Sequence, residues 1–376
     1  MHRADTIAFI KLGRFSHTNQ SVLELLKREF PACRVEVVDV LELGLLKPHK
    51  VTPLLWSALR RHGPGALANK TRLAKALVST PEFFTRARAG LLERLSRSRY
   101  LFTFQTQGLF DASVPGTPHF VYTDHTHLAN LSYPAFDRSK LLPAEWIEHE
   151  RSIYRNATVN YTMSSNISAS LVKDYGCRPD QVECVYVGTN ATIPPDPVAT
   201  NWNRPPRILF VGLAWERKGG PVLVEAFRRV RQEHPQAQLV IVGCTPRLSV
   251  PGCEIVGRVP LDRIGEYYRN ASIFCVPTRM EPFGIVFLEA FAYGLPVVAT
   301  RLGALPDFVR DDETGYLVPP DDVDALASRL SQLLSDPERC RQFGLRGREL
   351  VRSRYNWNAT GAALRESILK RLDQRS

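Results

Sequence analysis

The chain has 376 residues, of which 44% are hydrophobic and 23% charged, and its formal net charge is +11. This length favours two domains, and this composition excludes a chain that is disordered by default. No apolar run approaches the roughly 18 residues that a membrane helix needs, and the first one, Ile7–Ile10, is too short for a signal-peptide core. The seven cysteines include no C-x-x-C pair and are interpreted as reduced thiols, so we expect a cytoplasmic protein.

Positive charge is concentrated in residues 51–100, where ten lysines or arginines stand against two glutamates, a local excess of +8. Three interpretations compete: a solvated basic helical face, a surface for anionic lipid head groups, and a nucleic-acid patch. Apolar residues such as Trp56 and Phe83 interleave with the cations at helical spacing. That pattern suits an interfacial helix and equally suits any amphipathic helix that covers a core. No nucleic-acid motif accompanies the charge, so we expect no nucleic-acid partner.

The first half of the chain alternates short apolar runs with helical segments. The runs Thr6–Ile10 and Val35–Val40 indicate strands, separated by a turn at Gly13 and a helix at Ser21–Phe30. This order of elements is typical of the beginning of a doubly wound α/β domain.

Polar sequence follows two later apolar runs, Tyr100–Phe104 and His119–Tyr122, which we interpret as strands. Open α/β sheets bind ligands at the carboxyl ends of their strands. We therefore expect the segments that come next, 105–108 and 123–126, to line a cleft.

A second half of the same kind follows a proline-rich stretch. Residues 191–206 contain five prolines and little periodicity, which indicates a linker. A buried strand at Arg207–Val211 comes next, then a glycine-bearing loop with the cations Arg217 and Lys218, and then a helix that begins at Pro221. A pyrophosphate would meet backbone amides and both cationic side chains in this arrangement. The alternative is a basic surface turn.

The stretch Thr278–Thr300 indicates a β-α-β unit whose loop faces a ligand. Glu281 precedes Pro282, which disfavours helix at the residue before it, so we expect this carboxylate at a loop mouth. A short helix over Gly284–Tyr293 carries a second carboxylate, Glu289. Free backbone amides at the start of this helix would offer a site for phosphate oxygens: Gly284, Ile285 and Val286.

These residues carry a resemblance to a known family. Glu281 and Glu289, with P-F-G between them and G-L-P-V-V after them, resemble the E-x7-E signature of retaining, GT-B-fold glycosyltransferases of family 4, the glycosyl transferases group 1. Lys218-Gly219 resembles the family's R…K-G diphosphate element. Leu213 stands near the place of the family's arginine, and Arg217 is the residue that we expect to substitute for it. The resemblance is strong from about residue 207 to 357.

Two segments of the first half also bear on the resemblance. Residues Thr123–Thr126 resemble the family's T-x-H-T segment, which makes His125 the histidine that reaches toward the donor sugar. The run Gly188-Thr189-Asn190 departs from the family's N-G motif at the end of the first domain.

The resemblance implies a fold and a division of the chain. The expected fold class is α/β of the GT-B type, with two facing, Rossmann-like, doubly wound domains and a C-terminal helix that crosses back to the first domain. The expected parts are an acceptor-side domain at 1–190, the linker at 191–206, a nucleotide-sugar-binding domain at 207–354 and the crossing helix at 355–376.

The resemblance also implies an activity: a retaining glycosyltransferase that moves a hexosyl group from a UDP- or GDP-sugar to a glycan, lipid-linked or small-molecule acceptor. The implied catalytic residues are His125, Glu281 and Lys218. Those implied to bind the donor are Arg217, Lys218, Phe283, Gly284, Ile285, Val286 and Glu289. No D-x-D element falls at the predicted cleft, so we expect neither a metal nor another cofactor.

Two alternatives to a transferase stay open. One is a nucleotide-sugar-binding or regulatory protein with the same fold and no transferase activity, and the other is a sugar-nucleotide epimerase on that fold. In each case the nucleotide sugar is the expected partner. Residues 51–100 remain a candidate for peripheral contact with an anionic membrane at its inner face.

Overall fold

The computed structural model of the protein describes residues 5–13, 15, 18–190, 194 and 204–374. The chain divides into two compact units. Unit 1 comprises the chain up to Ala129, the segment Asp137–Val185 and the segment from Gly361 onward. Unit 2 comprises Asn130–Phe136 and Tyr186–Thr360. Most of the predicted linker 191–206 lies outside the described residues.

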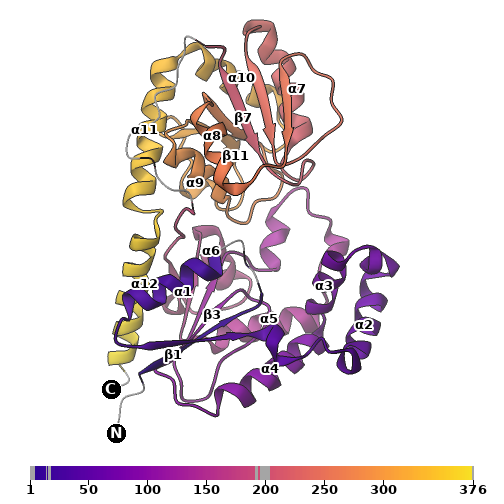
Figure 1. Ribbon diagram of the computed structural model, residues 1–376, viewed down its shortest axis with the longest axis vertical. Helices are drawn as coiled ribbons and strands as arrows, with labels where there is room; N and C mark the ends of the chain where they lie inside the picture. Colours follow the sequence, from indigo (N-terminus) through magenta and orange to yellow (C-terminus); the bar gives the residue numbers. More distant parts are fainter. Residues whose placement is uncertain (1–4, 14, 16–17, 191–193, 195–203, 375–376) are drawn as a thin grey trace. The chain divides into compact units, whose positions relative to one another are not determined.

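Unit 1 is built on a six-stranded parallel sheet with the strand order β2-β1-β3-β4-β5-β6 (Figure 1). Every residue of β3, β4 and β5 is buried, as expected for a parallel sheet whose faces are covered by helices. The strands are β1 Thr6–Lys11, β2 Arg34–Asp39, β3 Phe102–Thr106, β4 His119–Thr123, β5 Val159–Thr162 and β6 Val182–Cys184. The helices that alternate with them are α1 Thr18–Glu29, α5 Ala144–Asn156 and α6 Ser165–Lys173.

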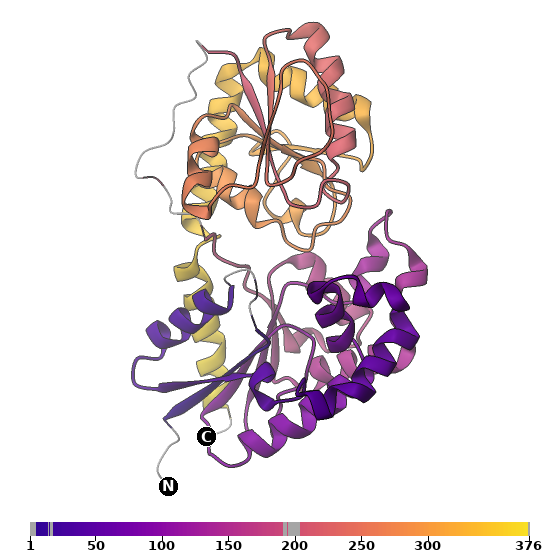
Figure 2. The same cartoon turned by 45° about the vertical axis from the view of Figure 1, so that its right-hand side comes forward.

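Three further helices of unit 1 lie between β2 and β3 in the chain and gather on one side of its sheet (Figure 2). They are α2 Pro48–His62, α3 Lys70–Val78 and α4 Pro81–Leu95. Their apolar stripes form a core with the sheet, in which Leu54, Phe83 and Leu91 are fully buried. Side-chain caps begin two of them: Asn69 accepts from the amide of Arg72, and Thr80 from that of Phe83.

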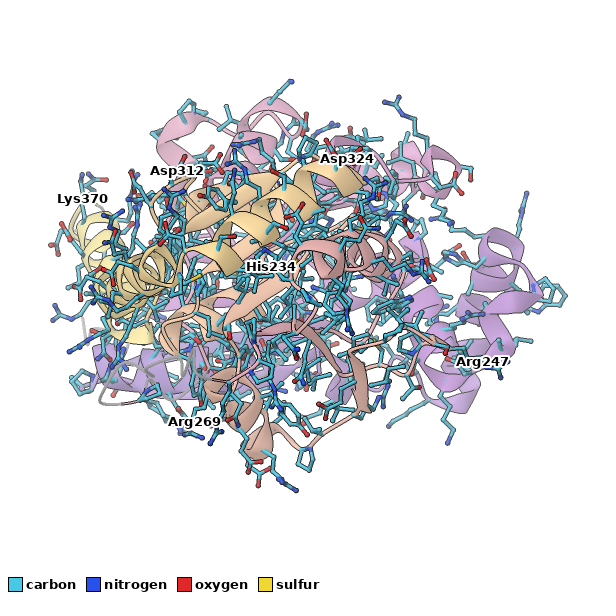
Figure 3. The ribbon with its side chains drawn as sticks, turned by 90° about the horizontal axis from the view of Figure 1, so that it is seen from above. His234, Arg247, Arg269, Asp312, Asp324 and Lys370 are labelled. Carbon is cyan, nitrogen blue, oxygen red and sulfur yellow. The ribbon has the colours of Figure 1, made fainter. Side chains whose placement is uncertain are left out.

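Unit 2 repeats the architecture with a six-stranded parallel sheet in the order β12-β11-β10-β7-β8-β9. Its strands are β7 Arg207–Val211, β8 Gln238–Val242, β9 Cys253–Gly257, β10 Ile273–Val276, β11 Val297–Thr300 and β12 Gly315–Val318. Its helices are α7 Gly220–Glu233, α8 Ile264–Arg269, α9 Ile285–Ala292, α10 Val323–Ser335 and α11 Pro337–Ser353. Helices α7 and α10 lie side by side, where Arg229 pairs with Asp324 and His234 lies next to Ser335 (Figure 3).

The last helix, α12, covers Trp357–Asp373 and belongs to unit 1 from Gly361 onward. Within unit 1, Ser367 accepts a hydrogen bond from the hydroxyl of Tyr161 at 2.9 Å, and Arg365 donates to the carbonyl of Glu29 at 3.0 Å. The predicted fold class is confirmed: two doubly wound, Rossmann-like domains, with a C-terminal helix that returns to the first.

One strand boundary was predicted wrongly. Gln105 and Thr106 were expected in a cleft loop, whereas both are fully buried inside β3. Gln105 is tolerated there because its amide is completely hydrogen-bonded: it donates to the carbonyls of Gln107 and Phe110 at 2.9 and 2.6 Å and accepts from the amide of Ala112 at 3.0 Å.

Candidate active site

Two loops of unit 2 meet at one edge of its sheet. Because β7 and β10 are neighbouring parallel strands, the loops that follow them leave the sheet at the same edge. Gly219, in the first loop, has φ +74°, and a Cβ atom there would lie only 1.8 Å from the carbonyl oxygen of Pro277 in the second. The two backbones are therefore in direct contact, and only glycine fits at this position.

A buried ion pair joins the two loops. The Nζ of Lys218 contacts the carboxylate of Glu281, and these residues are only 8% and 5% exposed. The prediction of Glu281 at a loop mouth is therefore wrong for its side chain, which is buried. A carboxylate at this depth is tolerated because a cation compensates its charge. The sequence indicated both residues as functional candidates but not their contact.

Hydrogen bonds to main-chain carbonyls hold the loops together around this pair. The carbonyl of Arg217 accepts from the amide of Arg279 at 2.9 Å and from the hydroxyl of Thr278 at 3.2 Å. The guanidinium of Arg217 is exposed and donates to the carbonyl of Met280 at 2.7 Å. Tyr133, which belongs to unit 2, donates to the carbonyl of Glu281 at 2.9 Å. The site is thus a preorganised framework with two adjacent cations, Arg217 and Lys218, in its first loop.

Helix α9 begins directly after the Glu281 loop. Gly284 is its N-cap, with φ +93°, and Ile285 and Val286 form its first turn. The amides of this turn have no acceptor within the helix and are available to an anion. Phe283 is buried and packs against Phe308, with ring centroids 5.6 Å apart, which anchors the residue just before this turn.

Glu289 lies one turn from the end of α9 and is half-buried. Its carboxylate accepts a hydrogen bond from the hydroxyl of Tyr268 at 2.9 Å. Burial raises the pKa of Glu289 to about 6, and the Tyr268 hydrogen bond lowers it only in part. Glu289 is therefore largely ionised at neutral pH and can accept hydrogen bonds from a ligand hydroxyl.

His125 lies in unit 1, in the loop that follows β4. Its main chain is fixed by Thr123, whose hydroxyl donates to the carbonyl of His125 at 2.8 Å. The neighbouring Asp124 is half-buried, and burial raises its pKa to about 6. His127 has a structural role: its Nε2 accepts from the amide of Leu142 at 2.8 Å, and burial lowers its pKa to about 4.

Several polar groups around these loops were missed from the sequence. Tyr133 and Tyr268 were absent from the predicted site, although each contacts one of the two predicted glutamates. Glu150, Tyr154 and Tyr175, which contact the main chain of the His125 loop, were also missed. The sequence did contain a signal for Glu150. This residue lies in the apolar stripe of α5 with Trp146 and Ile153, a position at which its carboxyl group is buried.

No helix among the described residues is long and apolar enough to cross a membrane. In the same part of the chain, no group of three or more histidine, cysteine, aspartate or glutamate side chains is placed to hold a metal ion.

A family model supports the class that this architecture suggests. Residues 205–336 match the family described as Glycosyl transferases group 1. The matched region spans both loops of the site and helix α9.

Characterised relatives match over part of their length. The chain is 34% identical over 177 residues to a GDP-mannose-dependent alpha-(1-6)-phosphatidylinositol monomannoside mannosyltransferase of Mycolicibacterium smegmatis, an alignment that covers 42% of this chain and 46% of that one. It is 31% identical over 272 residues to a D-inositol 3-phosphate glycosyltransferase of Corynebacterium efficiens, covering 65% and 64%. The aligned regions therefore span less than two thirds of these relatives.

Among solved structures, a sucrose-phosphate synthase from Thermosynechococcus elongatus is similar over 99% of this chain and 100% of its own, with a TM-score of 0.68 at 21% identity. Together these findings define a protein of the GT-B fold. Residues 205–336, in unit 2, match the model of the glycosyl transferases group 1 family, in agreement with the resemblance found in the sequence.

Proposed function

We propose that the protein is a retaining glycosyltransferase that moves a hexosyl group from a nucleotide-diphosphate sugar to a glycan, lipid-linked or small-molecule acceptor. One observation carries the proposal: the buried Lys218–Glu281 pair at the contact of two loops, directly ahead of α9. This arrangement brings a cation, a carboxylate and free helix amides together, which suits a diphosphate attached to a sugar.

In this proposal Lys218 binds the diphosphate without losing its partner. An ammonium group has three N–H donors, so it can keep the Glu281 carboxylate and still donate to phosphate oxygens. Charge develops on the diphosphate as the sugar–oxygen bond breaks, and a fixed cation stabilises that charge most in the transition state. Arg217 and the amides of Gly284, Ile285 and Val286 add donors around the same anion.

Each carboxylate has its own role. Glu289 accepts hydrogen bonds from the ribose hydroxyls, and Glu281 accepts them from hydroxyls of the transferred sugar. His125 reaches the donor sugar from unit 1. Configuration at the sugar is retained by front-face attack, with the leaving phosphate taking the acceptor's proton. We propose no metal requirement and no other cofactor, because Lys218 and Arg217 supply the positive charge.

The test is a panel of radiolabelled nucleotide sugars incubated with the purified protein and candidate acceptors. GDP-mannose comes first, because one relative is named as GDP-mannose-dependent, and UDP-glucose is tested next to it as a donor with the other base. Transfer to an acceptor with the anomeric configuration retained, in the presence of EDTA, is the expected result. Binding without turnover would favour the nucleotide-sugar-binding protein, and sugar interconversion without an acceptor would favour the epimerase. Turnover abolished by EDTA would contradict the metal-independent mechanism.

We further propose that the protein acts at the inner face of an anionic membrane. The surface that supports this proposal is narrower than residues 51–100. Arg88 and Arg94 are held internally by Asp111 and Glu36, so their charges are compensated. Exposed residues of α2, α3 and the turn between them define a basic-apolar patch: Trp56, Arg60, Leu67, Lys70, Arg72 and Lys75.

The apolar members of this patch are unusually exposed, since Trp56 is 72% and Leu67 52% accessible. Exposed aromatic and aliphatic side chains on helices that also carry exposed cations are typical of an interfacial surface. Each cation near an anionic surface contributes about 1 kcal/mol. We expect sedimentation with anionic vesicles, weakened by salt, and none with neutral vesicles.

A variant with Trp56→Ser, Lys70→Gln, Arg72→Gln and Lys75→Gln should remain in the supernatant. The matched control removes exposed cations that flank the end of α4, Arg97→Gln and Arg99→Gln, and should sediment like the wild type. Equal sedimentation of the patch variant and the control would contradict the membrane proposal and leave the transferase proposal standing.

A further inference from the structure

A buried carboxyl group lies beneath the His125 loop in unit 1 and has no place in the chemistry above. Glu150 is 3% exposed and projects from α5 between Tyr154 and Tyr175, which are both fully buried. Its carboxyl oxygens contact the Tyr175 hydroxyl, lie 3.4 Å from the Tyr154 hydroxyl, and accept from the backbone amide of His127 at 3.0 and 3.2 Å.

The partners of Glu150 hold the rest of the same loop. The Tyr175 hydroxyl accepts from the amide of Leu128 at 3.0 Å, and the Tyr154 hydroxyl lies 3.4 Å from the carbonyl of His125. These three side chains therefore contact the main chain at His125, His127 and Leu128. Since α5 and Tyr175 are anchored in the core of unit 1, the loop takes its position from them.

The packing around Tyr154 leaves little freedom for adjustment. A Cβ atom at Gly108 would lie 2.1 Å from the Tyr154 hydroxyl, so the backbone after β3 is in close contact with that group. The two segments that follow β3 and β4 thus share one buried hydroxyl. A small change at this hydroxyl would be transmitted to the carbonyl of His125.

Two opposing effects set the charge of Glu150. The hydrogen bonds from Tyr175, from the amide of His127 and from Tyr154 favour the carboxylate and lower its pKa. Burial has the larger effect and raises the pKa to about 8, so the neutral acid is favoured at neutral pH.

We propose that Glu150, together with Tyr154 and Tyr175, is a positioning residue that fixes the loop from Thr123 to Leu128 and thereby aims the side chain of His125. This inference rests on the proposed function, in which His125 reaches the donor sugar. It assigns Glu150 no contact with substrate.

The kinetic test replaces the carboxyl group and measures turnover separately from nucleotide binding. Glu150→Leu removes the acceptor of three buried donors and should lower kcat about 10- to 100-fold, the scale of a misplacement near 1 Å. The Kd for free nucleoside diphosphate should not change, because unit 2 binds it. Glu150→Gln reproduces the neutral acid and should restore most of the kcat.

Two comparisons separate positioning from general damage. Glu148→Leu, on the exposed face of the same helix, is the matched control and should turn over like the wild type. The double variant His125→Ala with Glu150→Leu should be no slower than His125→Ala alone, because a residue that acts only through His125 adds nothing once His125 is gone. Independent, multiplicative losses would overturn the proposal.

A second readout needs no activity. The ring signals of His125, assigned by their loss in His125→Ala, should shift in NMR spectra of Glu150→Leu and stay in place in Glu148→Leu. Should Glu150→Leu fail to fold, Tyr175→Phe removes a single hydroxyl and should move the same signals. Unmoved His125 signals would overturn the positioning role. A wild-type protein without turnover would instead contradict the proposed transferase, and the NMR comparison would still decide the role of Glu150.

Discussion

The loops that carry the candidate residues are held in opposite ways in the two units. In unit 2, Lys218 and Glu281 form a buried pair of charges, and the backbones of their loops touch at Gly219. In unit 1, the His125 loop rests on a carboxyl group whose pKa is raised to about 8 and on two tyrosine hydroxyls. One site is fixed by ions and backbone contact, and the other by neutral hydrogen bonds.

This difference follows from what each loop is proposed to do. A loop that receives a diphosphate needs cations at the surface of the site, and a buried partner keeps such a cation in place before the ligand arrives. A loop that presents one histidine needs a fixed main chain and no additional charge, which a neutral cluster provides. Variants that change charge should therefore affect unit 2 more than unit 1, and the following predictions test that contrast.

The largest effect is expected at Lys218. Lys218→Met should lower kcat/KM about 10²- to 10³-fold, the scale of removing one preorganised donor at a developing anion. It should also lower the free energy of unfolding by about 3–5 kcal/mol, because Glu281 is left buried without its cation. Steady-state kinetics and urea unfolding measure the two effects.

A double variant separates those effects. Lys218→Met with Glu281→Gln replaces the ion pair by two neutral side chains, so it should recover most of the stability and none of the activity. If activity returned together with stability, Lys218 would have only a structural role. Near wild-type kcat/KM in Lys218→Met alone would remove Lys218 from the site.

A smaller effect is expected at the backbone contact. Gly219→Ala places a methyl group 1.8 Å from the Pro277 carbonyl, at a φ of +74°. Gly294→Ala is the matched control: its φ is +76°, and nothing lies within 4 Å of the added Cβ. Both should lose the roughly 1–2 kcal/mol of a left-handed alanine. Only Gly219→Ala should lose more than this and turn over about tenfold slower, since Lys218 is displaced. Equal losses would show that the loop contact is unimportant.

The stability of unit 1 should depend on pH through Glu150. The folded pKa of Glu150, about 8, lies above its ordinary value of 4.5, so folding favours the neutral acid. Its stabilising contribution is fully present below pH 4.5 and declines by about 1.4 kcal/mol per pH unit as the pH rises toward 8. Glu150→Gln should lack this slope. The groups around Glu150 are Tyr154, Tyr175 and the neutral His127. Asp124, which interacts with Tyr154, has a pKa of about 6 and titrates in this interval in the wild type and in Glu150→Gln alike.

The measurement is the difference in unfolding free energy between the wild type and Glu150→Gln at several pH values. Because both proteins share their remaining titratable groups, the difference isolates Glu150. A flat difference would mean that the carboxyl group is ionised in the folded protein, and the contrast between neutral and charged loops would be lost.

The fold and the unit 2 residues could be predicted because their signals are local. Lys218 and Gly219 are adjacent, and Glu281 and Glu289 lie within one strand, loop and helix unit, so the local pattern and the family resemblance together indicated them. The sequence could not predict the contact of Lys218 with Glu281, because 63 residues separate them and the pairing of β7 with β10 brings them together.

The unit 1 site was less predictable for the same physical reason. His125, Glu150 and Tyr175 come from three segments of the chain. The sequence around each residue does not indicate which of the others it lies near. A glutamate within the apolar stripe of α5 indicates that something must neutralise or satisfy it, but not what does so.

The smallest effect is expected at Glu289. Its carboxyl group is intermediate between the ion-paired Glu281 and the buried Glu150, because it is half-buried and has one tyrosine partner. Its pKa of about 6 predicts that nucleoside diphosphate binds more weakly as the pH falls through that value, since the protonated acid is a poorer acceptor for ribose hydroxyls. One pH unit below the pKa leaves about a tenth of the carboxylate, so its contribution to binding should fall about tenfold between pH 7 and 5.

The diphosphate titrates in the same range, so the comparison must be made with Glu289→Gln, which keeps the ligand's own pH dependence and loses that of the carboxylate. Calorimetry with free nucleoside diphosphate should show a weaker and flatter profile for this variant. Tyr268→Phe removes the hydrogen bond that lowers the pKa of Glu289 and should move the inflection to higher pH. Glu281→Gln should slow transfer and keep the pH dependence of nucleotide binding, because Glu289 is retained. Identical profiles for Glu289→Gln and Glu281→Gln would show that the division of roles between the two carboxylates is wrong.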